Sequence, residues 1–193
     1  MGLTIHYTLT VKRGTRVRWF KNLLHRTRRL ALQSGCPQSS KVLHSTESDS
    51  DVPEWFQVAP GNRSRLDGGP GTHGWLLEIW PGEGCETALF GTLQHRRPLP
   101  RRKGQPSWRT RYSKCSDWKL RAFCKTCYAA RHGPDHFIEC HLRVIRLLDF
   151  LSEAGIKVEV HDETGYWKTR RIERLVSEGN SYCAYLNAVD NAG

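Results

Sequence analysis

The stretch that decides the fold class is HFIECHLRVIRLLDFLSEAGIKVEVH, residues 136–161. Up to about residue 154 its apolar side chains recur three and four positions apart, which is the period of a helix with one buried face. Asp135 is placed to cap the start of this helix, and Gly155 is typical of a residue that closes one. Residues 156–160 then alternate between apolar and polar side chains, as a half-buried strand does. A helix of about residues 136–154 that leads directly into a strand indicates a fold that combines helices with a sheet.

The rest of the chain supplies more elements of both kinds. Residues 3–11 alternate as a strand, and the helical pattern that follows ends near Gly35. We also expect strands at 75–80 and 87–93 around a glycine-rich turn. A short helix is expected at 120–130, and one or two terminal helices within 172–189. The sequence therefore predicts a single α+β domain over residues 1–193, with an antiparallel or mixed sheet and helices packed on one face. Irregular surface excursions are expected at about 38–73, with a short strand near Trp55, and at 95–107.

Composition limits the class of protein. A chain of 193 residues with 38% hydrophobic and 25% charged residues is long enough to bury a core. It has no apolar run long enough to span a membrane and no signal-peptide pattern at its start, so we expect a cytoplasmic protein without a membrane partner. Its 7 cysteines are an odd number, which fits a closed disulfide framework poorly.

Basic residues dominate the charge. The net charge is +11, residues 1–46 contain no acid, and residues 95–125 contain a single one, Asp117. Blocks of this kind attract polyanions by neutralising phosphates and releasing counterions. A solvated basic surface with no partner is the alternative interpretation. The sequence therefore keeps nucleic acid, or a smaller anionic ligand, as a possible partner.

Zinc is one candidate cofactor. Cys124 and Cys127 have the CxxC spacing of half a zinc site. His136 and Cys140 lie four positions apart on the predicted helix and share a face, so they could complete a tetrahedral set. The alternative is that the four residues are ordinary buried side chains. A divalent cation held by oxygen ligands is a second possibility.

Carboxylates gather next to predicted strand ends. Asp162 and Glu163 directly follow one strand, with Tyr166 close behind, and Glu83 and Glu86 lie in the glycine-rich turn after another. Such a set could hold a hard cation or perform general acid–base chemistry. The alternative is that Asp162 caps the following helix and the glutamates face water.

Two cysteines are candidate nucleophiles. Cys85 lies between two glutamates, whose charge raises the pKa of a thiol, so we expect a poor nucleophile there. Cys124 adjoins Lys125 in a basic region that favours thiolate. His141 falls on the buried face of its helix and could pair with Cys124 if the two meet in space.

Four motifs resemble those of a family of uncharacterised bacterial proteins. They are WPGEGCE at 80–86, FCKTCYA at 123–129, HLRVIRLLD at 141–149 and DETGYW at 162–167. Members of that family also open with a Gly-Leu-Thr-Ile-His-Tyr strand and commonly carry Gln where this chain has Cys127. The resemblance covers most of the chain outside 38–73 and 95–107. No activity is attached to the family, so it implies a shared fold and no function.

The leading hypothesis is a small enzyme or ligand-binding protein with one polar cleft. A carboxylate or His141 would handle protons there, and Lys125 would bind an anionic group. The competing hypotheses are a basic nucleic-acid-binding module, with or without zinc, and an interaction domain without chemistry. The candidate cleft residues are Glu83, Glu86, Lys125, His141, Asp162, Glu163 and Tyr166.

Overall fold

The computed structural model describes residues 3–12, 14–45, 73–94 and 118–191. Strands and helices are mixed along the chain, and α1 and α2 are separated in sequence by most of the strands. The elements are, in order, β1 (Thr4–Val11), α1 (Val17–Gln33), β2 (Gln38–Ser39), β3 (Leu43–Ser45), β4 (His73–Trp80), β5 (Ala88–Gln94), β6 (Trp118–Lys125), the 3-10 helix η1 (Cys127–His132), α2 (Pro134–Glu153), β7 (Lys157–Asp162), α3 (Tyr166–Thr169) and α4 (Ile172–Asp190).

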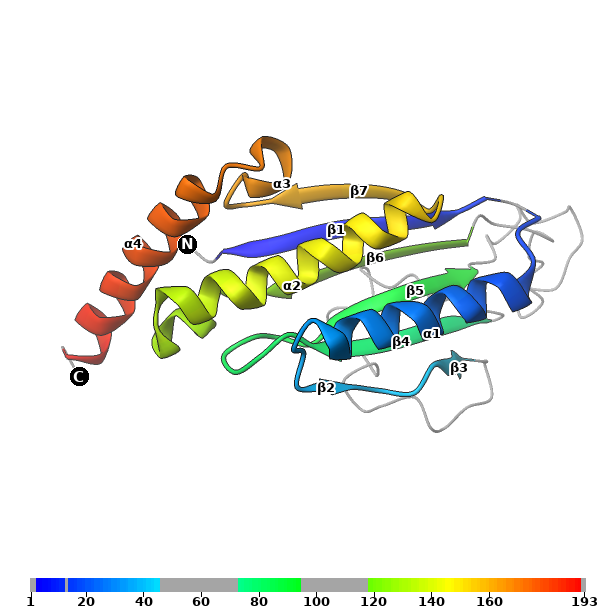
Figure 1. Cartoon of the computed structure of the whole chain (residues 1–193), viewed down its shortest axis with the longest axis horizontal. Coiled ribbons are helices and arrows are strands. Elements are labelled where there is room, and N and C mark those ends of the chain that lie inside the picture. The colour runs from blue at the N-terminus through cyan, green and yellow to red at the C-terminus, as the bar shows by residue number, and fades with distance from the viewer. Residues whose placement is uncertain (1–2, 13, 46–72, 95–117, 192–193) are drawn as a thin grey trace, which may run out of the picture.

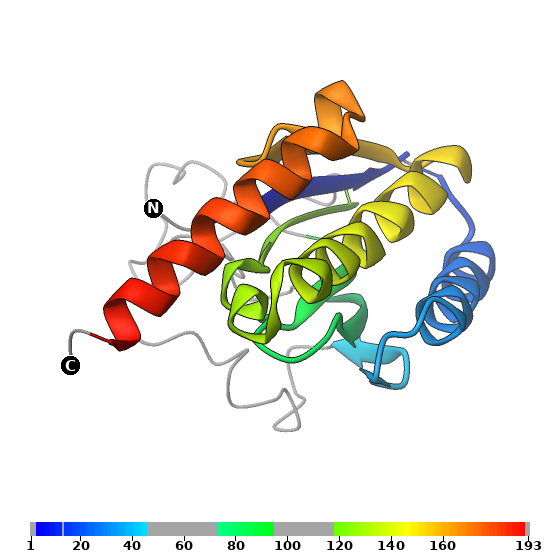
Figure 2. The ribbon, with the colours of Figure 1, turned by 60° about the vertical axis from the view of Figure 1, so that its left-hand side comes forward.

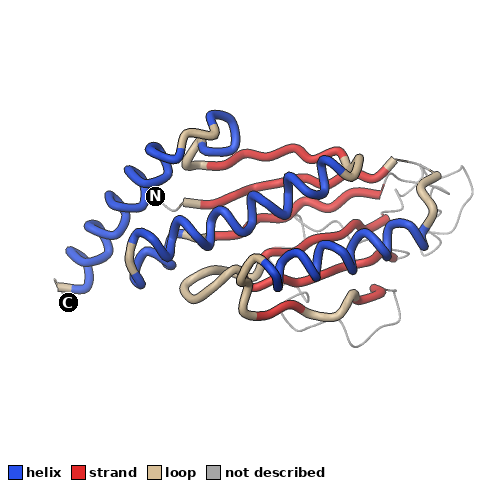
Figure 3. Tube along the Cα trace, viewed as in Figure 1, coloured by secondary structure: helices blue, strands red, loops and turns tan. Residues whose placement is uncertain are grey.

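The described strands form one antiparallel sheet with helices on one face. Its strand order is β2-β4-β5-β6-β1-β7, and β3 also pairs with β4. α1 and α2 lie side by side over the sheet, and α4 runs along the end of the layer (Figures 1 and 3). This arrangement confirms the predicted α+β domain and settles its sheet as antiparallel.

β1 lies inside the sheet because its alternating sequence gives it one face to bury. Ile5, Tyr7 and Leu9 are at most 3% exposed and point toward the helices. His6 between them is exposed, on the opposite face. β1 pairs with β6 on one side and with β7 on the other, so a strand from the start of the chain joins two from its second half.

The main core fills the space between the sheet and the two long helices. α1 contributes Phe20 and Leu24, and α2 contributes Ile145 and Leu148, all nearly or fully buried. These residues repeat at helical spacing, so each helix turns one apolar stripe to the sheet. Figure 2 shows α1 and α2 as a single layer in front of the strands.

One predicted helix is wrong, at residues 118–125. The sequence predicted a short helix over 120–130, whereas residues up to Lys125 form strand β6, and only the 3-10 helix η1 follows. Leu120 and Cys124 are buried, while Arg121 and Phe123 between them are exposed. This alternation of period two is that of a strand. The small residues that follow residue 125 made the strand pattern hard to recognise in the sequence.

Two smaller expectations also change. Gly133, not Asp135, occupies the N-cap of α2, and Asp135 lies in its first turn, where its charge suits the helix dipole. The excursion predicted from residue 38 begins with the short strands β2 and β3. The strand predicted near Trp55 and the excursion at 95–107 lie outside the described residues. Gly155 follows α2 with a positive φ, as predicted.

One tyrosine links two strands that are not neighbours. β5 and β6 pair only at Leu93–Lys119 and Gln94–Trp118, so the backbone of Leu89 has no ladder partner on β6. The buried hydroxyl of Tyr7, on β1, donates to the Leu89 carbonyl at 2.8 Å and accepts from the Leu89 N–H at 3.0 Å. The side chain thus satisfies both backbone groups, as burial requires.

Among the described residues, no helix combines the length and the apolar character needed to cross a membrane.

Candidate functional site

The glycine-rich turn at 80–86, the CxxC segment at 123–129 and the segment at 162–167 come together at one end of the sheet. β4 ends at Trp80, β6 at Lys125 and β7 at Asp162, and all three strands run toward the same end (Figure 1). The first half of α2 lies across this end. The turns after the three strands therefore lie close together. Their side chains, with those of α2, form two separate sites.

The first site is a buried polar network around His141. Its Nδ1 atom lies 3.0 Å from Thr126 Oγ1, and its Nε2 atom lies 3.4 Å from Asp162 Oδ1. Thr164 donates its hydroxyl to the Asp162 carboxylate at 2.8 Å. The side chains of His141 and Asp162 are both 0% exposed. The network joins β6, α2 and β7 in the interior.

This network lowers the pKa of Asp162 to about 2. Burial by itself raises that pKa, but the hydrogen bond and charge of His141 outweigh it, with bonds from the Trp167 N–H and from Thr164. The Asp162 carboxylate also accepts from the Thr164 N–H at 2.9 Å. Every atom of the pair is occupied by a protein partner and shielded from water. The geometry therefore favours a structural role for His141 and Asp162 over the proton handling that the sequence predicted.

The other predicted cleft residues do not converge with them. Lys125 forms a 3.3 Å ion pair with Glu86, and both side chains are more than 40% exposed. Glu163 accepts from the Thr4 N–H at 2.8 Å and is exposed on the outer side of the sheet. Tyr166 is half-buried and packs against the core. The described contacts do not join all seven residues, and one common cleft for them stays a prediction.

The predicted zinc set is also dispersed. Cys124 is buried in the main core and donates to the Glu86 carbonyl at 3.1 Å. Cys127 lies in a second apolar cluster, which also contains Cys140. His136 and Cys140 are in contact, but no group of three or more His, Cys, Asp or Glu in the described part of the chain is arranged to hold a metal.

The second site is a thiol cluster formed by Cys85, His136, Cys140 and Arg143. His136, Cys140 and Arg143 are four and three positions apart, so they share one face of α2. His136 Nε2 lies 3.5 Å from Cys140 Sγ, and Arg143 Nη1 lies 4.0 Å from it. Cys85, half-buried in the loop between β4 and β5, packs against the apolar cluster that contains Cys140.

The loop over this cluster needs glycine. A Cβ atom on Gly82 would lie 2.5 Å from Cys140 Sγ and 3.4 Å from His136 Cε1, so only the bare backbone fits above the thiol. The loop is held by Arg143, whose Nη1 donates to the Pro81 carbonyl at 2.8 Å. The Glu83 carbonyl lies 3.0 Å from His136 Nε2. Glu83 therefore enters this site through its backbone, while its side chain is exposed.

The cluster separates the proton affinities of its two thiols. The neighbouring Cys85 thiol, followed by the charges of His136 and Arg143, lowers the pKa of Cys140 to about 7, although burial opposes this. The pKa of Cys85 is raised, by the neighbouring Cys140 thiol and by burial. When the pair loses one proton, the negative charge therefore lies on Cys140, and Cys85 keeps its proton.

Sequence reasoning missed this cluster. It excluded Cys85 because of the adjacent glutamates, and it placed Cys140 only in a zinc set. The spacing of His136, Cys140 and Arg143 on one helix face was a visible signal, since cations beside a thiol stabilise the thiolate. What the sequence did not show is that the loop carrying Cys85 folds back onto that face.

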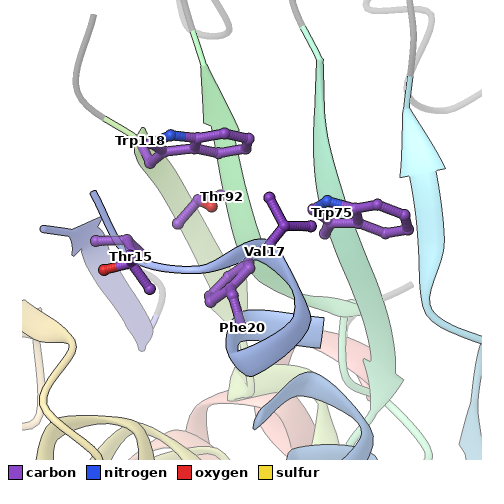
Figure 4. Close-up of a pocket in the computed structure, with 7 residues that line it drawn as sticks. Thr15, Val17, Phe20, Trp75, Thr92 and Trp118 are labelled. Carbon is purple, nitrogen blue, oxygen red and sulfur yellow. The ribbon is translucent and has the colours of Figure 1, made fainter. Parts of the chain in front are cut away.

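The apolar pocket in Figure 4 lies elsewhere. Trp75, Trp118 and Phe20 line it near the start of α1, together with Val17 and Thr92, at the opposite end of β1 from the thiol cluster. None of the predicted site residues lines it.

No protein-family model matches the chain, and neither a curated protein nor a solved structure shows significant similarity to it. The resemblance to uncharacterised bacterial proteins stays a prediction, and the function is argued from the site alone.

Proposed function

We propose that the protein is a redox protein that reduces disulfides through the thiol pair Cys85 and Cys140. The observation that carries this proposal is the packing of Cys85 against the cluster that contains Cys140, with His136 and Arg143 beside the buried partner. Two thiols in contact form an intramolecular disulfide at little entropic cost, and cations beside one of them favour thiolate. The proposal keeps the enzyme hypothesis but moves its site from the carboxylates to the thiols.

Access decides which thiol meets the substrate. Cys140 is 0% exposed beneath the glycine loop, whereas Cys85 is half-buried. Cys85 therefore attacks one sulfur of a disulfide R–S–S–R, and its proton passes to the neighbouring Cys140 thiolate. A mixed disulfide Cys85–S–S–R forms and R–S⁻ leaves.

The second step resolves the mixed disulfide. Cys140 gives its proton to the departing thiolate, becomes thiolate again, and attacks the Cys85 sulfur to release the second R–S⁻. Beginning from the singly ionised pair, the products are one R–SH, one R–S⁻ and one Cys85–Cys140 disulfide, so two electrons and one proton leave the protein. His136 and Arg143 stabilise the attacking thiolate, and a thiol reductant reverses the reaction.

Reaction with oxidised glutathione tests the proposal. Wild-type protein is expected to give a Cys85–Cys140 link in peptide mass mapping. Cys140→Ser should instead accumulate glutathione on Cys85, because the resolving sulfur is gone, and Cys85→Ser should react much more slowly. Cys183→Ser, at a half-buried cysteine on α4, is the matched control and should behave as wild type. Absence of the internal link in folded wild-type protein would favour the interaction domain without chemistry.

A further inference from the structure

The face of the sheet turned away from α1 and α2 carries a row of exposed rings. His6 on β1 is the direct cross-strand partner of both Phe123 on β6 and His161 on β7. Its ring centroid lies 5.9 Å from that of Phe123 and 6.1 Å from that of His161. Phe123 is 40% exposed, an unusual position for a large apolar ring. We call these three residues the ring row.

Cations continue the surface beyond the ring row. Arg121 and Lys119 follow Phe123 at every second position of β6, so their side chains lie on the same face. Arg121 is the cross-strand partner of Thr8, and Lys119 that of Thr10. The surface thus changes from rings to positive charge along one strand.

The carboxylates on this face already have partners. Glu159 forms an ion pair with Lys157 at 2.7 Å, and the pKa of Glu159 is lowered by the hydrogen bond to Lys157. Glu163 accepts from the Thr4 N–H at 2.8 Å and lies 3.6 Å from His6. The charges of Lys119 and Arg121 also act on Glu159, but among the described residues no ion pair joins them to it, so an incoming anion would meet these two cations without displacing the bonds above.

We propose that this outer face binds single-stranded nucleic acid. Bases would stack on the ring row, and the phosphates that follow would contact Arg121 and Lys119. Exposed rings on an open sheet flanked by cations are how several RNA-binding sheets hold unpaired bases. A duplex would leave the ring row unused, because its bases are already stacked on one another.

The test is fluorescence anisotropy of the full chain with a labelled single strand of about 12 nucleotides, within the range that such surfaces cover. Phe123→Ala is expected to weaken binding about tenfold, the effect of removing one stacking ring. Arg121→Gln should weaken binding by a smaller factor and reduce its dependence on salt. Arg121→Gln changes an exposed side chain, so it keeps the test valid if Phe123→Ala proves unstable.

Two controls separate this face from general attraction to a basic protein. Arg29→Gln removes an exposed cation from α1, on the other side of the sheet, and Tyr185→Ala removes a ring that is 56% exposed on α4. Both should bind the single strand within about twofold of wild type. A duplex of the same length and heparin, a polyanion without bases, should bind more weakly than the single strand.

Any one of three results would overturn the proposal. The first is equal binding by wild type, Phe123→Ala and Arg121→Gln. The second is an equal loss in Arg29→Gln and Arg121→Gln, and the third is heparin that binds as tightly as the single strand. None of these results bears on the thiol pair, because Cys85 and Cys140 belong to the loop and helix beyond the end of the sheet.

Discussion

His136 Nε2 lies 3.5 Å from Cys140 Sγ, one turn further along α2. The same nitrogen lies 3.0 Å from the Glu83 carbonyl, so a proton on it is shared between that oxygen and the sulfur. The imidazole thereby ties the glycine loop to the thiol that the loop covers. A side chain of this kind can set the protonation of the thiol pair without touching a substrate.

The first prediction concerns pH. Because the pKa of Cys140 is about 7, the thiol pair loses a proton as the pH rises through that value, and the rate of Cys85–Cys140 disulfide formation should rise with it. His136→Gln removes one cause of the lowered pKa, so the midpoint of the rate profile should move to higher pH. Stopped-flow measurements with oxidised glutathione between about pH 6 and 9 would record both profiles.

His132→Gln is the control for this experiment. His132 is exposed one turn before His136, with ring centroids 5.4 Å apart, and does not contact the thiols. Its variant should keep the wild-type midpoint. The account would be in error if both histidine variants had the same profile as wild type.

The second prediction concerns Tyr7. Tyr7→Phe removes only the hydroxyl and leaves the N–H and the carbonyl of Leu89 buried without a partner. We expect the free energy of unfolding to fall by about 2–3 kcal/mol, the usual cost of stranded buried polar groups. Denaturant titration would measure it, with Tyr185→Phe on the exposed side of α4 as control. A loss of less than about 0.5 kcal/mol would mean that the hydroxyl does not support the gap between β5 and β6.

The third prediction concerns acid. The folded pKa of Asp162 is about 2, below the ordinary value of 3.8, so the carboxylate stabilises the fold above pH 4, and this contribution is lost as the pH falls toward 2. The shift corresponds to roughly 2 kcal/mol. Asp162→Asn should therefore be less stable at neutral pH and lose less stability on acidification. Glu153→Gln, at an exposed position of α2, should keep the wild-type acid slope; equal slopes in wild type and Asp162→Asn would refute this role.

The fourth prediction concerns the glycine loop. Gly84 has φ +73°, and a Cβ there would lie 2.5 Å from the Tyr128 carbonyl oxygen and 2.6 Å from the Ala129 nitrogen. Gly155 has a similar positive φ of +92° but nothing within 4 Å of an added Cβ. Gly155→Ala should cost about 1 kcal/mol of conformational strain, whereas Gly84→Ala should cost at least about 2 kcal/mol more because backbone must move. Thermal unfolding of the two variants compares them directly, and equal costs would show that the loop does not pack on η1.

Much of the fold followed from periodicity. The alternation in β1, the helical period of α2 and the strand after Gly155 each have one buried face, which a single sequence displays. Strand β6 was predicted as a helix because Cys124 and Cys127 have helical spacing and small residues follow them. The alternation of Leu120 and Cys124 with cations was the signal for a strand. The partner of a strand and the contact between Tyr7 and Leu89 depend on residues 82 positions apart, and no local pattern encodes them.

In the candidate site, too, local features were predictable from the sequence and long-range contacts were not. The sequence identified the glycine loop, the CxxC and the segment after β7 as chemically dense, and the fold brings all three to one end of the sheet. Which side chains are in contact there depends on the tertiary structure, which a single sequence does not display. His141 met Asp162 in the interior and not Cys124, and Cys85 met Cys140 despite the glutamates that flank it in sequence.

The account rests on Cys85 and Cys140 acting as one redox unit, and a redox titration tests this most directly. Wild-type protein would be equilibrated in glutathione buffers of graded potential, and the free thiol at each cysteine quantified by alkylation and peptide mass spectrometry. The account predicts that Cys85 and Cys140 lose their thiols together in one two-electron transition, with the Cys85–Cys140 disulfide as product. Separate transitions for the two cysteines, or glutathione adducts without the internal disulfide, would contradict it.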